Sequence, residues 1–274
     1  MKLQDKLKQL KTEKRAILAA NFYNFETLSG ILQAASNLKL PVILQLSESS
    51  IRYMGLPVAS AMAKAAIKEY GVEAWLHLDH GSSVEMVQSC LDAGFDSVMI
   101  DASEKPVEEN IRLTQRVVQI AARYNAAVEA ELGFVAKLGQ EQDTHKFTQP
   151  EDAAMFISNT HVSALAIAIG SAHGFYKQSP KLDLELLSRI NKAIPTPLVL
   201  HGSSGIPDYV LQQAIANGIC KVNLATETKN TFMLALKERL RFNSEIDLRI
   251  VFPDATQAVV DLIEKKLEII NKAC

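Results

Sequence analysis

Short apolar runs alternate with amphipathic stretches along most of this chain. The apolar runs are rich in Val, Ile, Leu and Ala and are bounded by polar residues, which is typical of buried strands. They occupy residues 16–22, 41–47, 74–78, 96–101, 126–132, 162–170, 197–201 and 220–224. Apolar residues at helical spacing predict helices at 25–38, 57–70, 83–93, 106–124, 150–159, 183–193 and 207–217. Residues 133–150 are polar and irregular and predict a long loop.

Eight strand–helix units in succession predict a parallel sheet, and about 250 residues for eight units is the size of a closed (β/α)8 TIM barrel. An amphipathic helix within Met1–Arg15 precedes it, with Leu3, Leu7 and Leu10 on one face. Residues 226–274 add a helical extension with a break near Pro253. We therefore expect one TIM-barrel domain over residues 1–274. A doubly wound open sheet is the alternative, but no Gly-x-Gly-x-x-Gly follows the first strand.

Composition narrows the class of protein. Hydrophobic residues make up 48% of the chain and charged residues 22%, with a net charge of −2, as in ordinary soluble globular proteins. This balance gives no basic stripe for nucleic acid. The Lys-rich N-terminus lacks the apolar core of a signal peptide, and no apolar run approaches the ~20 residues of a membrane helix. Cys90, Cys220 and Cys274 form no disulfide or zinc pattern, so we expect a cytoplasmic enzyme with reduced thiols.

Polar residues recur where the predicted strands end. The clearest case is the run from Leu76 to Gly81, in which Asp79 and His80 close a buried strand. In such barrels the active site forms at the C-terminal ends of the strands, so residues of different strands meet there. The polar residues at these positions are Asn21, Ser47, Asp79, His80, Asp101, Glu131, His173, His201 and Asn223.

Three of the six histidines, His80, His173 and His201, belong to this set. One such histidine alone would more often be a structural hydrogen bonder. Three imidazoles with one open position are a common arrangement for catalytic zinc, so the set predicts a zinc site. The remaining histidines lie mid-strand, in a loop or beside one, and are assigned no role: His77, His145 and His161.

Carboxylates accompany these histidines. Asp79 adjoins His80 and could serve as general acid and base. Asp101 and Glu131 could hold a second cation, orient the histidines by hydrogen bonds, or only form salt bridges across the barrel mouth.

The segments after the seventh and eighth strands fit a phosphate site. Residues 201–205 read His-Gly-Ser-Ser-Gly, and residues 223–226 read Asn-Leu-Ala-Thr. Glycines let backbone N–H groups approach a phosphate, and the hydroxyls of Ser204 and Thr226 add donors. Phosphate sites of TIM barrels are often built from these two loops.

Together these segments resemble the zinc-dependent (class II) ketose-bisphosphate aldolases, the fructose- and tagatose-bisphosphate branch. The resemblance covers the chain from Asn21 to about Arg249. The matching segments are, in order, residues 77–81, 97–101, 129–133, 170–174, 201–205 and 221–227.

The resemblance implies a role for each matching residue. Catalytic zinc would be bound by His80, His173 and His201, and an alternative or second metal position would use Asp101 and Glu131. Asp79 would exchange a proton with the C4 hydroxyl of the substrate, and Ser47 would also contact the substrate. The dihydroxyacetone-phosphate half would contact Gly174, Gly202, Ser203, Ser204, Asn223, Leu224, Ala225 and Thr226. Arg249 resembles an arginine that reaches a phosphate in a neighbouring subunit of some members, which implies a homodimer or homotetramer.

The loop after the fifth strand departs from the family pattern. In relatives a glutamate on this loop acts as the second acid/base, and Glu141 is the best match here. Relatives usually read Glu-Leu-Gly, two residues, Gly-Gly, one residue, Glu-Asp. Residues 131–143 lack the Gly-Gly pair and contain two further residues. The change bears on the assignment of Glu141 and on the monovalent cation site (Na+ or K+) that some relatives form nearby. It also bears on the loop closure that excludes water from the site. The change is compatible with a different aldehyde partner.

We therefore expect a zinc aldolase that cleaves fructose or tagatose 1,6-bisphosphate to dihydroxyacetone phosphate and glyceraldehyde 3-phosphate. A related deoxy-keto-sugar phosphate is an alternative substrate. A metal-dependent hydrolase is an alternative enzyme, since three histidines and an acid also activate water. A binding protein that retains the metal site is a further alternative. A Schiff-base aldolase is disfavoured, because Lys221 begins its strand and so lies at the wrong end.

Overall fold

Eight parallel strands close into a barrel in the computed structural model, which describes residues 1–135, 147–176, 180–242 and 244–272. The strands are β1 (Ile17–Asn21), β2 (Val42–Ser47), β3 (Ala74–Gly81), β4 (Ser97–Ile100), β5 (Ala127–Leu132), β6 (Ala164–Ile167), β7 (Leu198–Leu200) and β8 (Ile219–Leu224). Each strand pairs with its neighbours in chain order, and β8 pairs with β1. The predicted TIM barrel is confirmed, and the open sheet is wrong.

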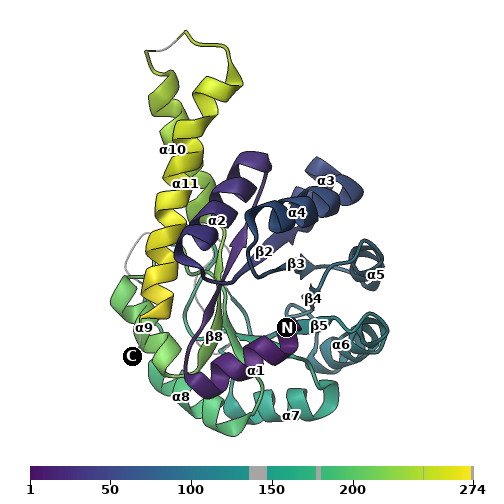
Figure 1. Ribbon diagram of the computed structural model, residues 1–274. Helices are drawn as coiled ribbons and strands as arrows, with labels where there is room; N and C mark the ends of the chain where they lie inside the picture. Colours follow the sequence, from purple (N-terminus) through teal and green to yellow (C-terminus); the bar gives the residue numbers. More distant parts are fainter. Residues whose placement is uncertain (136–146, 177–179, 243, 273–274) are drawn as a thin grey trace.

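Helices surround the barrel (Figure 1). They are α1 (Leu3–Glu13), α2 (Phe25–Leu38), α3 (Glu48–Met54), α4 (Leu56–Tyr70), α5 (Val84–Asp92), α6 (Val107–Ala122), α7 (Pro150–Thr160), α8 (Leu184–Ala193), α9 (Asp208–Ala216), α10 (Thr226–Leu240) and α11 (Leu248–Asn271). Side chains of Asn24, Ser83 and Asp183 cap α2, α5 and α8 by accepting backbone N–H groups. No described helix is both long and apolar enough to cross a membrane.

The sequence predicted a break near Pro253 in the C-terminal helical region, and that prediction is wrong. α10 ends at Leu240 and α11 begins at Leu248, whereas Pro253 lies inside α11. A proline in a helix costs one backbone hydrogen bond and strain of about 3 kcal/mol. Burial of Val251 and Ala255 on either side of Pro253 offsets that cost. The C-terminal end of α10, the N-terminal end of α11 and the described residues between them project from the barrel as an arm (Figure 1).

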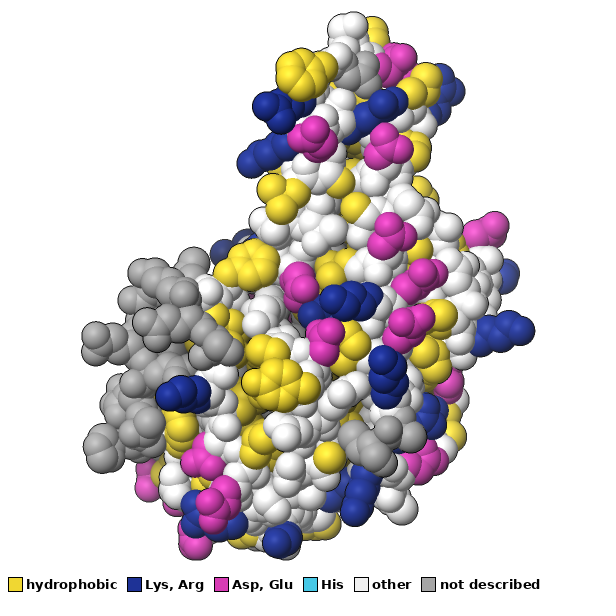
Figure 2. Space-filling view, turned by 90° about the vertical axis from the view of Figure 1, so that its left-hand side faces the viewer, with side chains coloured by type: hydrophobic (Ala, Val, Ile, Leu, Met, Phe, Trp, Pro, Cys, Tyr) yellow, Lys and Arg dark blue, Asp and Glu magenta, His cyan; other side chains and the backbone are white. Residues whose placement is uncertain are grey.

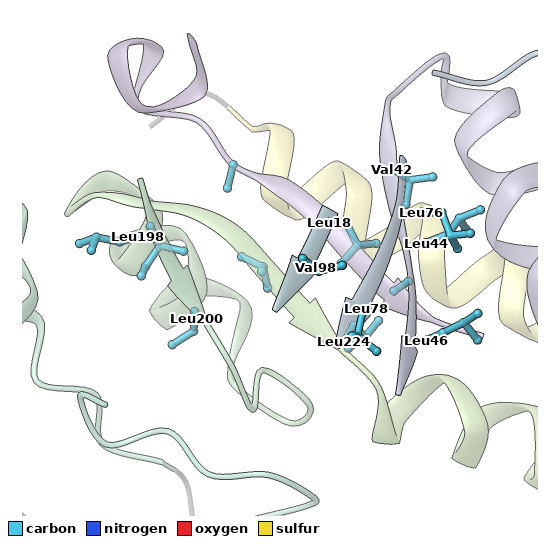
Figure 3. Close-up of a cluster of buried hydrophobic side chains, with 14 of the residues drawn as sticks. Leu18, Val42, Leu44, Leu46, Leu76, Leu78, Val98, Leu198, Leu200 and Leu224 are labelled. Atoms are coloured by element: carbon cyan, nitrogen blue, oxygen red, sulfur yellow. The ribbon is translucent and has the colours of Figure 1, made fainter. Parts of the chain in front are cut away.

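The core has one apolar layer between the strands and the helices. Alternate residues of each strand point outward, and those of β1 to β4, β7 and β8 form a continuous apolar surface (Figure 3). Leu44, Leu76, Val98 and Leu200 are among them, and each is fully buried. Burial on both faces explains why the strands read as apolar runs in the sequence.

The barrel interior changes from apolar to polar along its axis. At its N-terminal end, strand residues such as Ile43 and Trp75 form a cluster with Leu3, Leu7 and Leu10 of α1, which closes this end of the barrel. Further along the axis, polar residues are buried inside the barrel. On the strands they are Asn21, Gln45, His77, Asp79, Ser97, Glu129, Glu131, Lys221 and Asn223, and His201 directly follows β7. The fold therefore gathers titratable groups at one end of the barrel.

Replacing Leu7 by alanine is expected to lower the free energy of unfolding by about 2–5 kcal/mol, because it leaves a cavity under the barrel. Leu7 is 2% exposed. Urea unfolding followed by circular dichroism measures the change, with Val58→Ala as control, since Val58 is 61% exposed. Equal stability of the two variants would contradict the closing role of α1.

Candidate active site

Three histidines meet at the polar end of the barrel: His80 at the end of β3, His201 directly after β7, and His173 on the loop after β6. The ring centroids lie 4.9 Å apart for His80 and His173, 4.7 Å for His80 and His201, and 5.8 Å for His173 and His201. One nitrogen from each ring lies within 4.8 Å of the others. Nε2 of His80 faces Nδ1 of His201 at 3.0 Å. The structure thus brings together the three histidines that the sequence selected.

Carboxylates hold the outer nitrogens of two of these rings. Nδ1 of His80 lies 2.7 Å from Oδ2 of Asp101, and Nε2 of His201 lies 2.9 Å from Oε1 of Glu129. Histidines that bind metals commonly have such a partner on the second nitrogen. Because three imidazole nitrogens converge and carboxylates fix two of the rings, the residues fit a divalent cation, and imidazole suits zinc.

A second group of possible ligands overlaps the first. Atoms of His80, Asp101 and Glu131 also lie within 4.8 Å of one another. Glu131 is 2% exposed, and its Oε2 has no hydrogen-bond partner among the described residues. Burial raises the pKa of the Glu131 carboxyl, and the nearby Asp101 carboxylate adds to this effect. A cation bound here would relieve both features.

The backbone at the end of β3 turns two successive side chains toward the site. In a regular strand Asp79 and His80 would point in opposite directions. His80 has a φ of 51°, and the register of β3 with β4 shifts between Leu78 and Gly81. A positive φ is uncommon for a residue other than glycine and is concentrated at functional sites. Gly81 is required next to it, because a Cβ there would lie 2.6 Å from the carbonyl oxygen of Met99.

Asp79 is buried beside the histidines. The Nδ2 of Asn21 donates to Oδ2 of Asp79 at 2.9 Å, and Gln45 Nε2 donates to Oδ1 of Asn21 at 3.0 Å. Burial alone would raise the pKa of Asp79, but the positive charges of His80 and Lys221, the nearby ring of His201 and the hydrogen bond from Asn21 outweigh it and lower the pKa to about 2. Burial would likewise lower the pKa of His80, but Asp79, Asp101 and Glu131 raise it to about 10. Asp79 is therefore an oriented, ionised carboxylate.

A narrow cavity of about 50 Å³ lies against these groups. The predicted substrate-binding residues that line it are Gly174, Gly202, Ser203, Ser204, Asn223, Ala225 and Thr226. Helix α10 begins at Thr226, so its first backbone N–H groups lie at this cavity and favour an anion. A wider cavity of about 630 Å³ shares His80 and His173 and adds Ser82, Glu104 and Lys105.

Two tyrosines hold the loops around the narrow cavity. Tyr176 Oη accepts from Ala172 N at 2.8 Å and donates to the Gly202 carbonyl at 2.7 Å. Tyr23 Oη donates to the Ala225 carbonyl at 3.2 Å. Gly202 has a φ of 67°, and a Cβ there would overlap the carbonyl oxygen of Ala172. These contacts tie the loops to one another and define the shape of the narrow cavity.

The other predicted site residues lie outside this arrangement. Leu224 points outward into the apolar layer (Figure 3), where it is 1% exposed. Ser47 caps α3 by accepting from Ser50 N. Arg249 lies on the arm, with its side chain 89% exposed and paired with Asp247 at 2.7 Å. Glu141 falls outside the described residues.

Sequence reasoning missed the polar residues beneath the histidines. Lys221 Nζ lies 2.8 Å from Oε2 of Glu129, and His77 Nδ1 lies 2.8 Å from Ser97 Oγ. The available signal was a polar residue at an inward position of an otherwise apolar strand. Lys221 is paired and does not line either cavity, which agrees with the argument against a Schiff-base lysine.

Comparison with known proteins gives matches over nearly the whole chain. The family model for fructose-bisphosphate aldolase class II matches residues 1–273. The YdjI aldolase from Escherichia coli K12 is similar with a TM-score of 0.89 and 32% identity, over 98% of this chain and 96% of that one. A candidate fructose-1,6-bisphosphate aldolase from Coccidioides immitis is similar with a TM-score of 0.89 and 30% sequence identity, over 98% of this chain and 96% of that one. The fructose-bisphosphate aldolase from Campylobacter jejuni shares the fold, with a TM-score of 0.84 and 24% sequence identity, over 98% of this chain and 94% of that one.

Proposed function

The chain belongs to the class II fructose-bisphosphate aldolase family and is a carbon–carbon lyase, and on this basis we propose that it cleaves a ketose 1,6-bisphosphate reversibly with zinc. The substrate is fructose or tagatose 1,6-bisphosphate, and the products are dihydroxyacetone phosphate and glyceraldehyde 3-phosphate. One observation carries the proposal: three converging histidines and the ionised Asp79 adjoin a cavity that ends at a helix N-terminus. A helix N-terminus favours binding of a phosphate group. We therefore prefer an aldolase that acts on a phosphorylated ketose to the alternative of a metal-dependent hydrolase.

Zinc would be held by His80, His173 and His201. When bound, the ion acts as a Lewis acid that draws electrons from the substrate carbonyl, so that no covalent bond to the protein is needed. Asp101 and Glu129 hold the rings of His80 and His201 in position. The group of His80, Asp101 and Glu131 supports the second metal position that the resemblance implies.

Asp79 is the general acid and base at the C4 hydroxyl. In cleavage its carboxylate removes the hydroxyl proton while the C3–C4 bond breaks, and in condensation it returns the proton. Its low pKa supplies the ionised form that removal requires. The bond from Asn21 leaves Oδ1 of Asp79 turned toward Nε2 of His80, which lies 3.8 Å away.

The phosphate of the dihydroxyacetone half binds at the N-terminus of α10, with the hydroxyls of Ser204 and Thr226 as donors. The aldehyde half extends into the wider cavity that shares His80 and His173. Glu141 serves as the second acid/base, and a monovalent cation binds nearby. The changed loop at residues 131–143 is compatible with a different aldehyde partner. A related deoxy-keto-sugar phosphate is the alternative substrate.

The test is release of dihydroxyacetone phosphate from both bisphosphates, before and after EDTA and with zinc added back. We expect cleavage that EDTA abolishes and zinc restores, and the ratio of the two rates names the substrate. A zinc-loaded protein that cleaves neither compound would refute the bisphosphate assignment. Condensation of dihydroxyacetone phosphate with a panel of aldehydes would then identify the aldehyde half.

We also propose a homodimer or homotetramer in which the arm contacts a second copy. The arm carries exposed apolar side chains (Figure 2), and Phe242 and Ile246 are each 90% exposed. Such clustered apolar groups mark interaction surfaces. Arg249 is exposed on the arm and does not line the narrow cavity of its own chain, which supports its predicted role in a neighbouring subunit.

The prediction is that the protein sediments as an oligomer at micromolar concentration and that Ile246→Glu shifts it toward the monomer, because a buried unpaired charge at the interface is costly. Tyr53→Glu is the control, since Tyr53 is 81% exposed on α3, away from the arm. Sedimentation velocity measures both. A monomeric unmodified protein would contradict the assembly.

A further inference from the structure

A buried ion pair lies beneath His201 in the barrel interior. Oε2 of Glu129 lies 2.8 Å from Lys221 Nζ, and Oε1 of the same carboxylate lies 2.9 Å from Nε2 of His201. The side chains of His201, Glu129 and Lys221 are 1%, 2% and 1% exposed. Each carboxylate oxygen thus has its own partner, in a place that bulk water does not reach.

This contact determines which nitrogen of His201 carries the proton. An ionised carboxylate only accepts hydrogen bonds, so Nε2 of His201 must be the protonated nitrogen. In the neutral ring the lone pair is then on Nδ1, the atom that lies 3.0 Å from Nε2 of His80. The amide nitrogen of Asn223 lies 3.1 Å from Nε2 and 3.4 Å from Nδ1. As a donor it can bond only to the ring nitrogen that holds the lone pair, which the contact of Nε2 with Glu129 makes Nδ1.

Lys221 directs the carboxylate as well as balancing its charge. Separating the two charges in the barrel interior would leave each of them buried and uncompensated, which is strongly unfavourable. The ammonium of Lys221 therefore keeps Oε2 of Glu129 beside it, and Oε1 is left for His201. His77 is the other ring near Glu129, with Nε2 at 3.8 Å from Oε2. Ser97 holds His77 by its Nδ1 at 2.8 Å. His201 is therefore the only ring among the described residues with a hydrogen bond to Glu129.

We propose that Glu129, oriented by Lys221, is a positioning residue that fixes the tautomer of His201 and so turns Nδ1 toward the metal centre. The inference rests on the proposed metal site. The competing explanation is that the ion pair only fills the barrel interior. The two explanations differ in what they predict for the proton on His201 and for zinc affinity.

The first experiment needs neither metal nor substrate. Nitrogen-15 NMR of the metal-free, unmodified protein at about pH 8 reports the tautomer of each histidine, and the spectrum of His201→Gln assigns the signals. We expect a single tautomer of His201 with the proton on Nε2. A proton on Nδ1, or a mixture of both tautomers, would overturn the proposal. Because no turnover is measured, this result is independent of whether the ketose assignment holds.

The second experiment removes the charges and keeps the volume. In Glu129→Gln/Lys221→Met the amide can present either its oxygen or its NH2 group to Nε2, so both tautomers of His201 become allowed. We expect zinc to bind about 10–100-fold more weakly, as when outer partners of metal ligands are lost, and the NMR spectrum to show a mixture. If zinc affinity stayed within about threefold of that of the unmodified protein and His201 kept one tautomer, the proposal would be overturned. The ion pair would then only fill the barrel interior.

Lys266→Met is the matched control for charge and stability. Lys266 is also a buried lysine, with a side chain 7% exposed and paired with Glu227 at 3.1 Å, but it contacts none of the three histidines. We expect this variant to lose stability and to keep its zinc affinity and its His201 tautomer. Circular dichroism checks that each variant folds, and if the double variant does not, the NMR of the unmodified protein decides alone.

Discussion

Replacing His173 by asparagine is expected to abolish tight zinc binding and to lower kcat/KM for ketose cleavage by about 10³-fold or more. That factor corresponds to about 4 kcal/mol of transition-state stabilisation. Two imidazoles would remain where three now converge, with ring centroids 4.7 Å apart. His80 and His201 keep their carboxylate partners in this variant, so the loss reports the missing ligand alone.

The measurement pairs zinc content after dialysis with steady-state kinetics. His161→Asn is the matched control, because His161 is exposed at the end of α7 with a φ of 56°, a conformation that asparagine tolerates. The control should bind zinc and turn over as the unmodified protein does. If His173→Asn retained both stoichiometric zinc and full activity, the three-histidine site would not be the catalytic centre.

The sequence could predict this fold because its strands are buried on both faces. Outward residues such as Leu44 and inward residues such as Ile43 are both apolar, so each strand appears as an uninterrupted run. α3 escaped detection because it is a single short helix without an apolar stripe, begun by the cap of Ser47. The predicted break at Pro253 was wrong because the low helix propensity of proline is outweighed by the packing of α11 against the barrel.

The histidines could be predicted for a topological reason, since a closed barrel brings the ends of all its strands to one mouth. Glu129 and Lys221 could not be paired in the same way, because they are separated by 92 residues and lie within strands. Leu224 shows a different limit. Matching a motif residue by residue selected it, but alternation along β8 places Asn223 inward and Leu224 outward.

Asp79 offers the sharpest test of the chemistry. Asp79→Asn is expected to lower kcat for cleavage by about 10²–10⁴-fold, the usual contribution of a general acid or base. The amide is isosteric and can still accept the bond from Asn21, so the pocket should keep its shape. It cannot remove a proton from the C4 hydroxyl.

Dihydroxyacetone phosphate alone separates the role of Asp79 from a general loss of activity. Exchange of its C3 hydrogen with D2O involves no C4 hydroxyl, so Asp79→Asn should retain exchange, followed by proton NMR, while it loses cleavage. Asp183→Asn is the control, because Asp183 caps α8 and asparagine caps a helix equally well. Equal loss of exchange and cleavage in Asp79→Asn would mean that Asp79 acts before the C4 step, through the neighbouring His80 or the dihydroxyacetone half. Retained exchange with lost cleavage assigns the C4 proton to Asp79 and leaves the C3 proton to a second group. Glu141→Gln is the complementary variant, and we expect it to lose both exchange and turnover, because dihydroxyacetone phosphate is released only after C3 is protonated.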